Sequence, residues 1–327
     1  MNESLFIVSL DFELLWGVRD KRTIESYGPN IAGVREVIPS LLQLFDEFGI
    51  SASFATVGFL FARNKQDLLQ YIPSTLPQYG LSKYSPYANG YLDKIGNSEA
   101  DDIYHYAGTL IDMIRQHPSQ EIASHTFSHY YCLENASLES FREDMLAAKK
   151  IAAARGIELK TIVFPRNQYS PQHIAICKEL GFIGYRGNPA ASIYDPRKNE
   201  EQSKYVRASR FADSYINISG DHTFPIAKSN DIVNIPASSF LRPFSSKLKA
   251  LDTLRLKRIK NSMSFAARNR QAYHLWWHPH NFGVNLAENL AFLKQILQHY
   301  QKLHHEFGMK SKTMKTIAEE ILEPHAI

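Results

Sequence analysis

Two histidines four residues apart are the first residues in this sequence that could do chemistry. His125 and His129 belong to the stretch His-Thr-Phe-Ser-His, which directly follows a short apolar segment of β character. Neutral imidazole is the commonest metal-binding side chain, and a spacing of one helical turn lets both rings face one point beyond a strand end. Because the chain has 13 histidines, such a pair also arises by chance, so a metal site needs a third ligand from elsewhere.

Two acidic residues stand at the end of the first predicted strand. The apolar run 5–10 is typical of a strand buried on both faces, and it leads into Asp11-Phe12-Glu13. Alternation along a strand places both carboxylates on one side and Phe12 on the other.

Two further strand ends carry polar side chains. Arg166 follows a predicted strand at 160–164, and His278 follows another at 273–277. Taken alone, each such residue has an ordinary structural interpretation as a cap, a surface ion pair or a core histidine. Active sites of parallel α/β folds form where the carboxyl ends of the strands meet. Polar groups at four strand ends therefore favour one shared site.

Alternating strands and helices predict a parallel α/β architecture, with further strands at 51–57 and 182–186. Helices are predicted at 32–48, 100–116, 136–155, 172–180, 247–268 and 286–305, and a strand-helix pair ends the chain. Two proline-rich stretches, 73–97 and 188–245, interrupt this rhythm and are predicted to be long irregular insertions, the second with room for extra short strands.

The composition is that of an ordinary globular protein. Of the 327 residues, 44% are hydrophobic and 21% are charged, and the formal net charge is +4. Dispersed basic residues argue against a nucleic-acid partner. The N-terminus is interpreted as a strand rather than a signal peptide, and no apolar run reaches the roughly 18 residues that span a bilayer. With only two cysteines, the chain is expected to be cytoplasmic.

The motifs and their order resemble the polysaccharide deacetylase family, the carbohydrate esterases with nodulation-protein-type homology. His125-Thr-Phe-Ser-His129 matches the family's His-Ser/Thr-x-x-His, and Leu275-Trp-Trp-His278 matches its late Leu-x-x-His. The resemblance covers most of the chain, from about residue 5 to residue 322.

The sequence departs from the family pattern in two places. Asp11-Phe-Glu13 replaces the commoner pair of adjacent aspartates, as in an Asp-x-Asp/Glu subset. The family's Arg-x-Pro-Tyr motif is present only as Phe-Pro-Arg-Asn-Gln around Arg166. The assignment of Glu13 and the role of Arg166 depend on these two departures.

The resemblance implies an α/β fold, a distorted and incomplete (β/α) barrel of about seven parallel strands. One domain would span residues 1–327, and the insertions at about 73–97 and 188–245 would shape the choice of substrate. The implied activity is metal-dependent hydrolysis of an N- or O-linked acetyl group on a sugar or glycan precursor.

The resemblance also implies roles for the residues at the strand ends. His125, His129 and a first-strand carboxylate, Glu13 in preference to Asp11, would bind a divalent metal, with Zn²⁺ favoured. Asp11 would be the general base, and His278 would protonate the leaving group. Arg166 would hold Asp11 in its ionised form or bind substrate. Trp16, Trp276 and Trp277 would stack on a sugar ring, unless they pack in the core.

Two alternatives remain open at this level. One is an amidohydrolase that acts on a non-sugar C–N bond, such as a ureide ring. The other is a catalytically inactive relative that binds carbohydrate, although the presence of both a base and an acid argues against it. The expected partner is an acetylated sugar, nucleotide sugar or glycan of surface-polysaccharide biosynthesis; the sequence indicates no oligomeric state.

Overall fold

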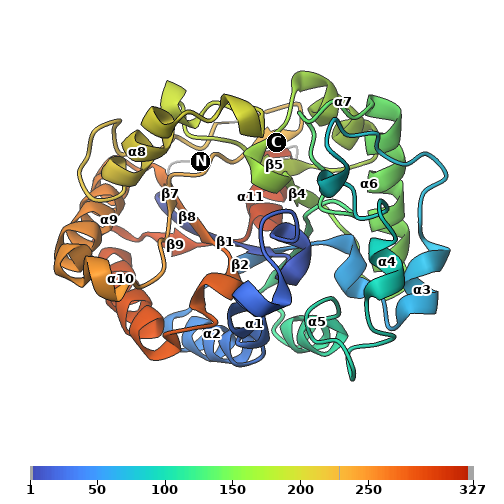
Figure 1. Ribbon diagram of the computed structural model, residues 1–327. Coiled ribbons are helices and arrows are strands. Elements are labelled where there is room, and N and C mark those ends of the chain that lie inside the picture. The colour runs from blue at the N-terminus through green and yellow to red at the C-terminus, as the bar shows by residue number, and fades with distance from the viewer. Residues whose placement is uncertain (1–2, 228, 323–327) are drawn as a thin grey trace.

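A curled parallel β-sheet forms the centre of the computed structural model, which describes residues 3–227 and 229–322 (Figure 1). Within these residues the sheet has nine strands, in the order β6-β5-β4-β3-β2-β1-β8-β7, and β9 (Lys310–Ser311) pairs with β1. The ladders between these strands are parallel. The chain thus has the predicted α/β fold, an incomplete (β/α) barrel.

Six strands make up most of the sheet. They are β1 (Leu5–Phe12), β2 (Ala52–Thr56), β3 (Glu121–Ser124), β4 (Thr161–Val163), β5 (Gly184–Arg186) and β8 (Ala272–Trp277). The central strand β1 lies between β2 and β8 and is buried at every position. A strand enclosed on both faces needs apolar residues throughout, which explains its continuous apolar run.

The predicted insertion at 188–245 contributes the two ends of the sheet. β6 (Val233–Asn234) pairs with β5, and β7 (Ser239–Phe240) pairs with β8. Between them, the Ser238 N–H donates to the His274 carbonyl at 2.8 Å. One short segment thereby links the two ends of the curled sheet. It accounts for the larger number of strands than the seven expected from the sequence.

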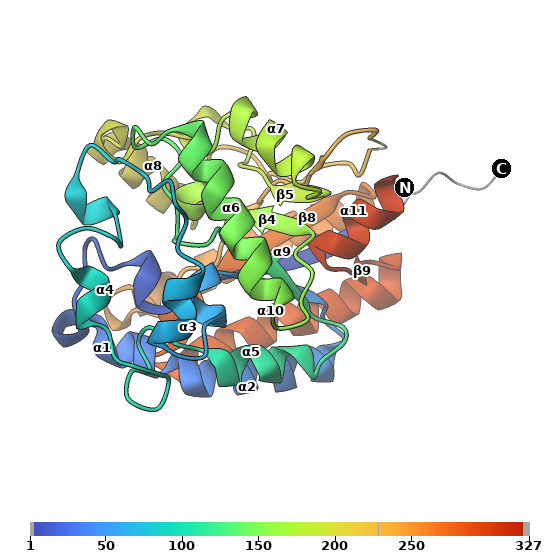
Figure 2. The ribbon, with the colours of Figure 1, turned by 90° about the vertical axis from the view of Figure 1, so that its right-hand side faces the viewer.

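Helices surround the sheet (Figures 1 and 2). They are α1 (Ile24–Ala32), α2 (Val34–Phe48), α3 (Lys65–Gln70), α4 (Tyr91–Lys94), α5 (Gly108–Arg115), α6 (Leu138–Ala153), α7 (Pro171–Glu179), α8 (Lys204–Asp213), α9 (Asp252–Arg268), α10 (Leu286–Phe307) and α11 (Met314–Leu322). In α2, apolar residues at helical spacing form the buried face, and Gly49 with φ 64° ends the helix as the sequence predicts.

The helix predicted at 100–116 begins only at Gly108. The carboxylate of Asp102 holds the preceding residues in an irregular loop, because it accepts hydrogen bonds from the N–H groups of Gly96 at 2.8 Å and Tyr104 at 3.1 Å. It also bonds the His105 ring at 2.7 Å. A side chain that satisfies backbone donors in this way competes with the helical turn.

Both predicted insertions lie around the carboxyl ends of the strands. Figure 2 shows α4, from 73–97, and α8, from 188–245, on the side of the barrel opposite the N-terminus. Tyr84 in the first insertion contacts Tyr131, which follows the histidine motif, with ring centroids 5.3 Å apart. The two insertions are therefore placed to border a site at the strand ends.

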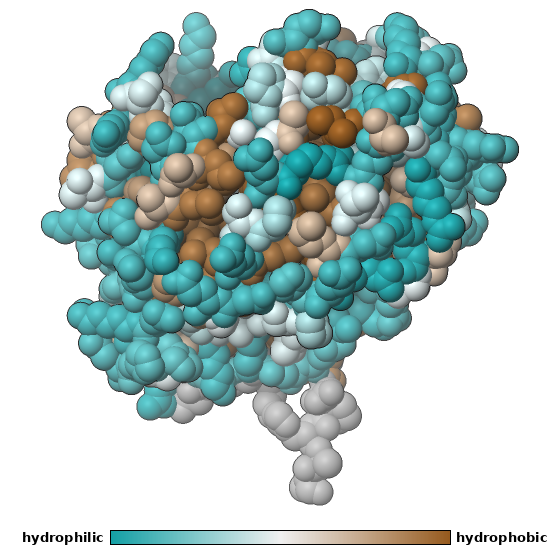
Figure 3. Space-filling view, turned by 90° about the horizontal axis from the view of Figure 1, so that it is seen from below, coloured by the Kyte–Doolittle hydropathy of each residue, from teal (hydrophilic) through white to brown (hydrophobic). Residues whose placement is uncertain are grey.

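The underside of the molecule is mostly hydrophilic. Figure 3 shows apolar side chains in several areas of this face, among hydrophilic ones. None of the described helices combines the length and the apolar character that crossing a membrane requires.

Two glycines allow the α1–α2 junction to pack against the turn after β8. A Cβ atom on Gly33 would lie 2.0 Å from the carbonyl oxygen of Gly283. Gly33 has φ −61°, which alanine adopts without strain, so only the steric contact opposes a substitution. We expect Gly33→Ala to lower the free energy of unfolding by about 1–3 kcal/mol, measured by urea denaturation.

Gly80→Ala is the matched control for this prediction. Its added Cβ would meet only the flexible side chain of Asn135, at 3.3 Å, so the free energy of unfolding should change by less than about 0.5 kcal/mol. Equal stability of the Gly33→Ala and Gly80→Ala variants would contradict the close packing of this junction.

Candidate active site

A carboxylate and two imidazoles meet at the carboxyl end of the sheet. Glu13 follows β1, and the loop with His125 and His129 follows β3. Nε2 of His125 lies 3.2 Å, and Nε2 of His129 3.0 Å, from the same carboxylate oxygen of Glu13. All three side chains are buried, and their potential ligand atoms lie within 4.8 Å of one another. The structure thus brings together the three residues predicted as ligands.

The hydrogen bonds of these residues fit a bound cation. Nδ1 of His125 lies 2.8 Å from the carbonyl oxygen of Val163, so this nitrogen carries the proton and Nε2 presents a lone pair. Burial lowers the pKa of His129 to about 4, which favours its neutral form. The lone pair on Nε2 of His125 repels the carboxylate oxygen 3.2 Å away, and a cation bound between them would remove this repulsion. Two imidazole nitrogens and a carboxylate oxygen form a donor set of catalytic zinc sites.

The loop that carries the two histidines has an unusual backbone. Thr126 and His129 have φ values of 62° and 57°, in the left-handed region that residues other than glycine seldom adopt. The carboxylate of Asp144, on α6, stabilises this loop. It accepts hydrogen bonds from the N–H groups of Phe127 at 2.7 Å and Ser128 at 3.2 Å. The sequence analysis missed Asp144, whose signal is an acidic residue on the buried face of a helix.

Asp11 forms a buried ion pair with Arg186. The two carboxylate oxygens of Asp11 lie 2.6 and 2.9 Å from Nη1 and Nη2 of Arg186, the last residue of β5. Arg186 also donates to Oγ of Ser9 and to Oδ1 of Asn167, each at 3.0 Å. Burial raises the pKa of Asp11, but Arg186 together with His125 and His278 more than offsets this effect, and the net pKa is lowered. Asp11 is therefore ionised at neutral pH.

Of the two roles expected of Arg166, the bidentate contact with Asp11 is absent from the described structure, so that expectation was wrong, while substrate binding stays a prediction. Nη2 of Arg166 instead lies 2.5 Å from Oδ2 of Asp20, and its guanidinium stacks 4.0 Å from the Tyr131 ring centroid. Arg166 has φ 57°, in a turn directly after β4 that directs its side chain to these partners. Arg186 makes the contact instead, and its signal is a charged residue at the end of a buried strand.

His278 lies at the entrance to the cluster. Its Nε2 is 3.8 Å from a carboxylate oxygen of Asp11 and 3.7 Å from one of Glu13. The His278 side chain is 24% exposed, whereas those of the two acids are 4% exposed, so His278 is the group that solvent and ligands reach first.

A further histidine, His280, supports this arrangement and was missed by the sequence analysis. Its ring stacks on that of His278, with centroids 4.9 Å apart and planes inclined by 21°. Nδ1 of His280 lies 3.9 Å from Glu13, and burial lowers the pKa of His280 to about 3. The sequence signal is its position two residues after His278, in the same turn.

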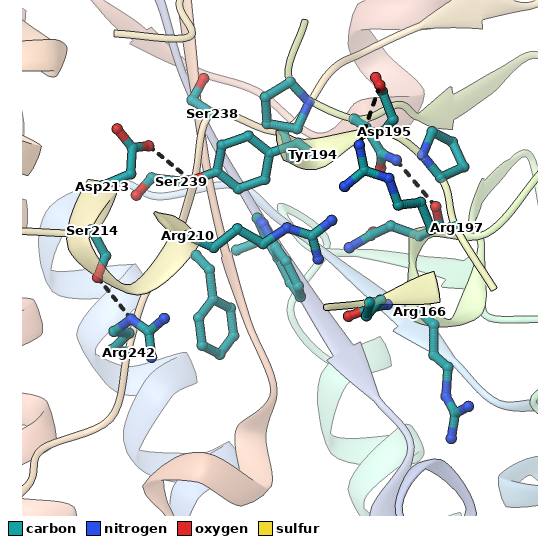
Figure 4. A pocket seen from close by; sticks show the side chains of 18 of the residues that line it. Arg166, Tyr194, Asp195, Arg197, Arg210, Asp213, Ser214, Ser238, Ser239 and Arg242 are labelled. Atoms are coloured by element: carbon teal, nitrogen blue, oxygen red, sulfur yellow. Dashed lines mark hydrogen bonds and ion pairs between the residues drawn. The ribbon is translucent and has the colours of Figure 1, made fainter. Parts of the chain in front are cut away.

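A cavity of about 230 Å³ adjoins the cluster on the side of His278 (Figure 4). Trp276 and Arg166 line it from the barrel, and residues from 188–245 form most of the rest of its wall. Of the three tryptophans considered for sugar stacking, Trp16 and Trp277 are fully buried in the core. Trp276 faces the cavity, so it is the tryptophan placed to contact a ligand.

Comparison with known proteins identifies the family. The sequence profile of the family described as polysaccharide deacetylase matches residues 27–184. The match includes His125 and His129, while Asp11, Glu13 and His278 lie outside it. The chain belongs to the polysaccharide deacetylase family.

Solved structures share the fold of this polysaccharide deacetylase family member. A protein from Mycobacterium smegmatis assigned as a polysaccharide deacetylase has a TM-score of 0.60 and 13% identity, over 100% of this chain and 94% of that one. One from Pseudomonas aeruginosa PAO1 has a TM-score of 0.55 and 12% identity, over 99% and 91%. Puue allantoinase has a TM-score of 0.54 and 12% identity, also over 99% and 91%. No curated protein matches the chain.

Gly17 packs directly against the carboxylate of Glu13. A Cβ atom on Gly17 would lie 1.9 Å from Cδ of Glu13 and 2.0 Å from its Oε1, so an added methyl group must displace the carboxylate from the two imidazoles. We expect Gly17→Ala to weaken the binding of Zn²⁺ by about 10- to 100-fold, measured by competition with a chromophoric chelator. The Gly80→Ala variant should bind Zn²⁺ like the unaltered protein. Unchanged affinity in Gly17→Ala would show that Glu13 is not a ligand.

Proposed function

We propose that this protein is a metal-dependent hydrolase that removes an N- or O-linked acetyl group from a sugar or a glycan precursor. One observation carries the proposal. Beside the cavity, His278 lies within 3.8 Å of an ionised carboxylate, Asp11, and 3.7 Å from a second carboxylate, Glu13, which faces two imidazoles. An acid, a base and a set of metal ligands are the groups that acyl hydrolysis requires.

Glu13, His125 and His129 would hold the metal. A divalent ion such as Zn²⁺, when bound there, supplies a Lewis acid that polarises the acyl carbonyl and lowers the pKa of water towards about 7. Glu13 is favoured over Asp11 as the carboxylate ligand, because Glu13 faces both imidazoles while Arg186 occupies both oxygens of Asp11.

Asp11 would act as the general base. It would take a proton from the attacking water while the water oxygen bonds to the acyl carbon. Arg186 favours the ionised form of Asp11 and fixes the direction of its carboxylate through two hydrogen bonds. Arg186 is thus a positioning residue for the base.

His278 would act as the general acid. Its imidazole lies between the two acids and the cavity, where the departing nitrogen or oxygen of the sugar would be. Donation of a proton from His278 completes the cleavage of the C–N or C–O bond. The products are acetate and a free amino or hydroxyl group on the sugar.

Acetate release is the direct test of this function. Purified protein would be stripped with a chelator, reconstituted with Zn²⁺ and incubated with N- and O-acetylated monosaccharides, oligosaccharides and nucleotide sugars. Metal-dependent release of acetate supports the proposal. Hydrolysis of an added ureide alone would favour the non-sugar amidohydrolase, and binding of sugars without any hydrolysis would favour an inactive carbohydrate-binding protein.

Substitution of the base and the acid should separate catalysis from metal binding. We expect Asp11→Asn and His278→Ala each to lower kcat by at least about 100-fold, because general acid or base assistance is typically worth about 10²–10⁴ in rate. Both variants should keep their metal content, measured by elemental analysis. Loss of metal in Asp11→Asn would mean that Asp11, not Glu13, is the ligand.

The control for this experiment is His305→Ala, which removes an exposed histidine on α10. Its kcat and metal content should equal those of the unaltered protein. Normal kcat in both Asp11→Asn and His278→Ala would show that these residues are not the catalytic pair.

A further inference from the structure

The cavity beside His278 is rich in arginine. Among the described residues its lining includes these charged side chains besides His278: Arg166, Arg197, Arg210, Arg242, Arg258, Asp195 and Asp213. Three of the arginines have carboxylate partners, since Arg166 lies 2.5 Å from Asp20, Arg197 lies 3.7 Å from Asp195 and Arg258 lies 3.2 Å from Asp221. The cavity therefore has more positive than negative charge.

Arg210 and Arg242 form no ion pair with any carboxylate in residues 3–227 and 229–322. Nε of Arg210 donates to the Ile193 carbonyl at 2.6 Å, and Nε of Arg242 donates to Oγ of Ser214 at 2.7 Å. Each of these bonds uses the Nε–H of the guanidinium group and thereby fixes the position of the side chain. Figure 4 shows Arg210 extending into the middle of the cavity. The structure thus holds two guanidinium groups in place with no described carboxylate at ion-pair distance from either.

The unpaired arginines are electrostatically unfavourable in the absence of a ligand. Burial lowers the pKa of both Arg210 and Arg242, and the positive charge of Arg197 lowers that of Arg210 further, against smaller opposite effects of Tyr194 and Asp195. An anion in the cavity would relieve this repulsion. The two guanidinium groups add positive charge to the cavity, which attracts a phosphoryl group of about −1.5 to −2 more strongly than a single carboxylate. Planar guanidinium groups also fit phosphate oxygens in a bidentate manner.

We propose that the cavity binds a phosphoryl group carried by the sugar substrate, with Arg210 and Arg242 as its ligands. This inference rests on the proposed function, because it names the substrate class of the same site. Sugar phosphates, nucleoside diphosphate sugars and lipid-linked sugar phosphates all share this chemistry.

An aromatic wall connects the two parts of the site. The Trp276 ring lies 5.6 Å from the ring of His278 and 4.7 Å from that of Phe240, and all three side chains line the cavity. Arg186 stacks on Trp276 at 4.2 Å and so fixes its ring. A sugar ring against this wall would place its acetyl group beside His278 and its phosphoryl group among the arginines.

Substitution of the two arginines tests the proposal. The substrates would be one N-acetylated sugar in four forms: free, as its 1-phosphate, as its nucleoside diphosphate derivative and linked to a short polyprenyl phosphate. We expect Arg210→Gln and Arg242→Gln each to lower kcat/KM for the phosphorylated forms by about 10-fold, and the double variant by about 100-fold, mainly through KM. The rate with the free sugar should stay unchanged, which also shows that each variant is folded.

Arg207→Gln is the matched control. Arg207 lies on the same helix, α8, but is exposed and does not line the cavity. Its kinetic constants with every form of the sugar should equal those of the unaltered protein. The ranking of the three phosphorylated forms identifies which source supplies the phosphoryl group.

Calorimetric titration with pyrophosphate gives a second measurement that needs no catalysis. Pyrophosphate binding that is lost in the double variant supports the phosphoryl site. If the protein binds pyrophosphate in this way but releases no acetate from any substrate, the proposed function is overturned and the phosphoryl site is not. Equal kcat/KM for free and phosphorylated sugars, in both the unaltered protein and the double variant, would overturn the phosphoryl site and leave the hydrolase intact. Preference for an acetylated uronic acid over the phosphorylated forms would likewise overturn it.

Discussion

The guanidinium group of Arg186, on β5, reaches across the interior of the barrel to the carboxylate of Asp11 on β1, and the two form a bidentate ion pair. Both side chains are almost fully buried, so removal of either partner would leave an unpaired charge in the core, which typically costs about 3–5 kcal/mol. The pair therefore ties opposite sides of the sheet together. It also decides which of the two first-strand acids remains free to face the histidines.

The chemistry of the site follows from this division. Because Arg186 occupies Asp11, Glu13 is the carboxylate that faces His125 and His129, and this buried group of ligand atoms could hold a metal ion. Asp11 stays ionised, as the proposed base must be, and His278 lies between the buried acids and the cavity. The sheet positions these groups, since they all lie at or just beyond the carboxyl ends of β1, β3, β5 and β8.

Features set by local sequence were predictable, whereas those set by tertiary contacts were not. The buried strand β1, the α2 helix and the meeting of Glu13 with His125 and His129 follow from apolar periodicity and from the common edge of a parallel sheet. The choice between Arg166 and Arg186 as the partner of Asp11 does not follow from the sequence, because both arginines lie at or just beyond the ends of neighbouring strands. It depends on one positive φ angle, at Arg166, that no sequence pattern indicates. The arginine cavity could not be predicted either, since its wall comes from a long irregular segment.

The presence of a metal between Glu13, His125 and His129 can be measured most directly by anomalous diffraction, with data collected on both sides of the zinc absorption edge from crystals grown with Zn²⁺. The expected result is an anomalous peak about 2.0–2.2 Å from Nε2 of both histidines and from a carboxylate oxygen of Glu13. The peak should be absent from crystals of His129→Ala with the fold unchanged. A peak bound to Asp11 instead, or no peak at this site in fully folded protein, would contradict the metal centre.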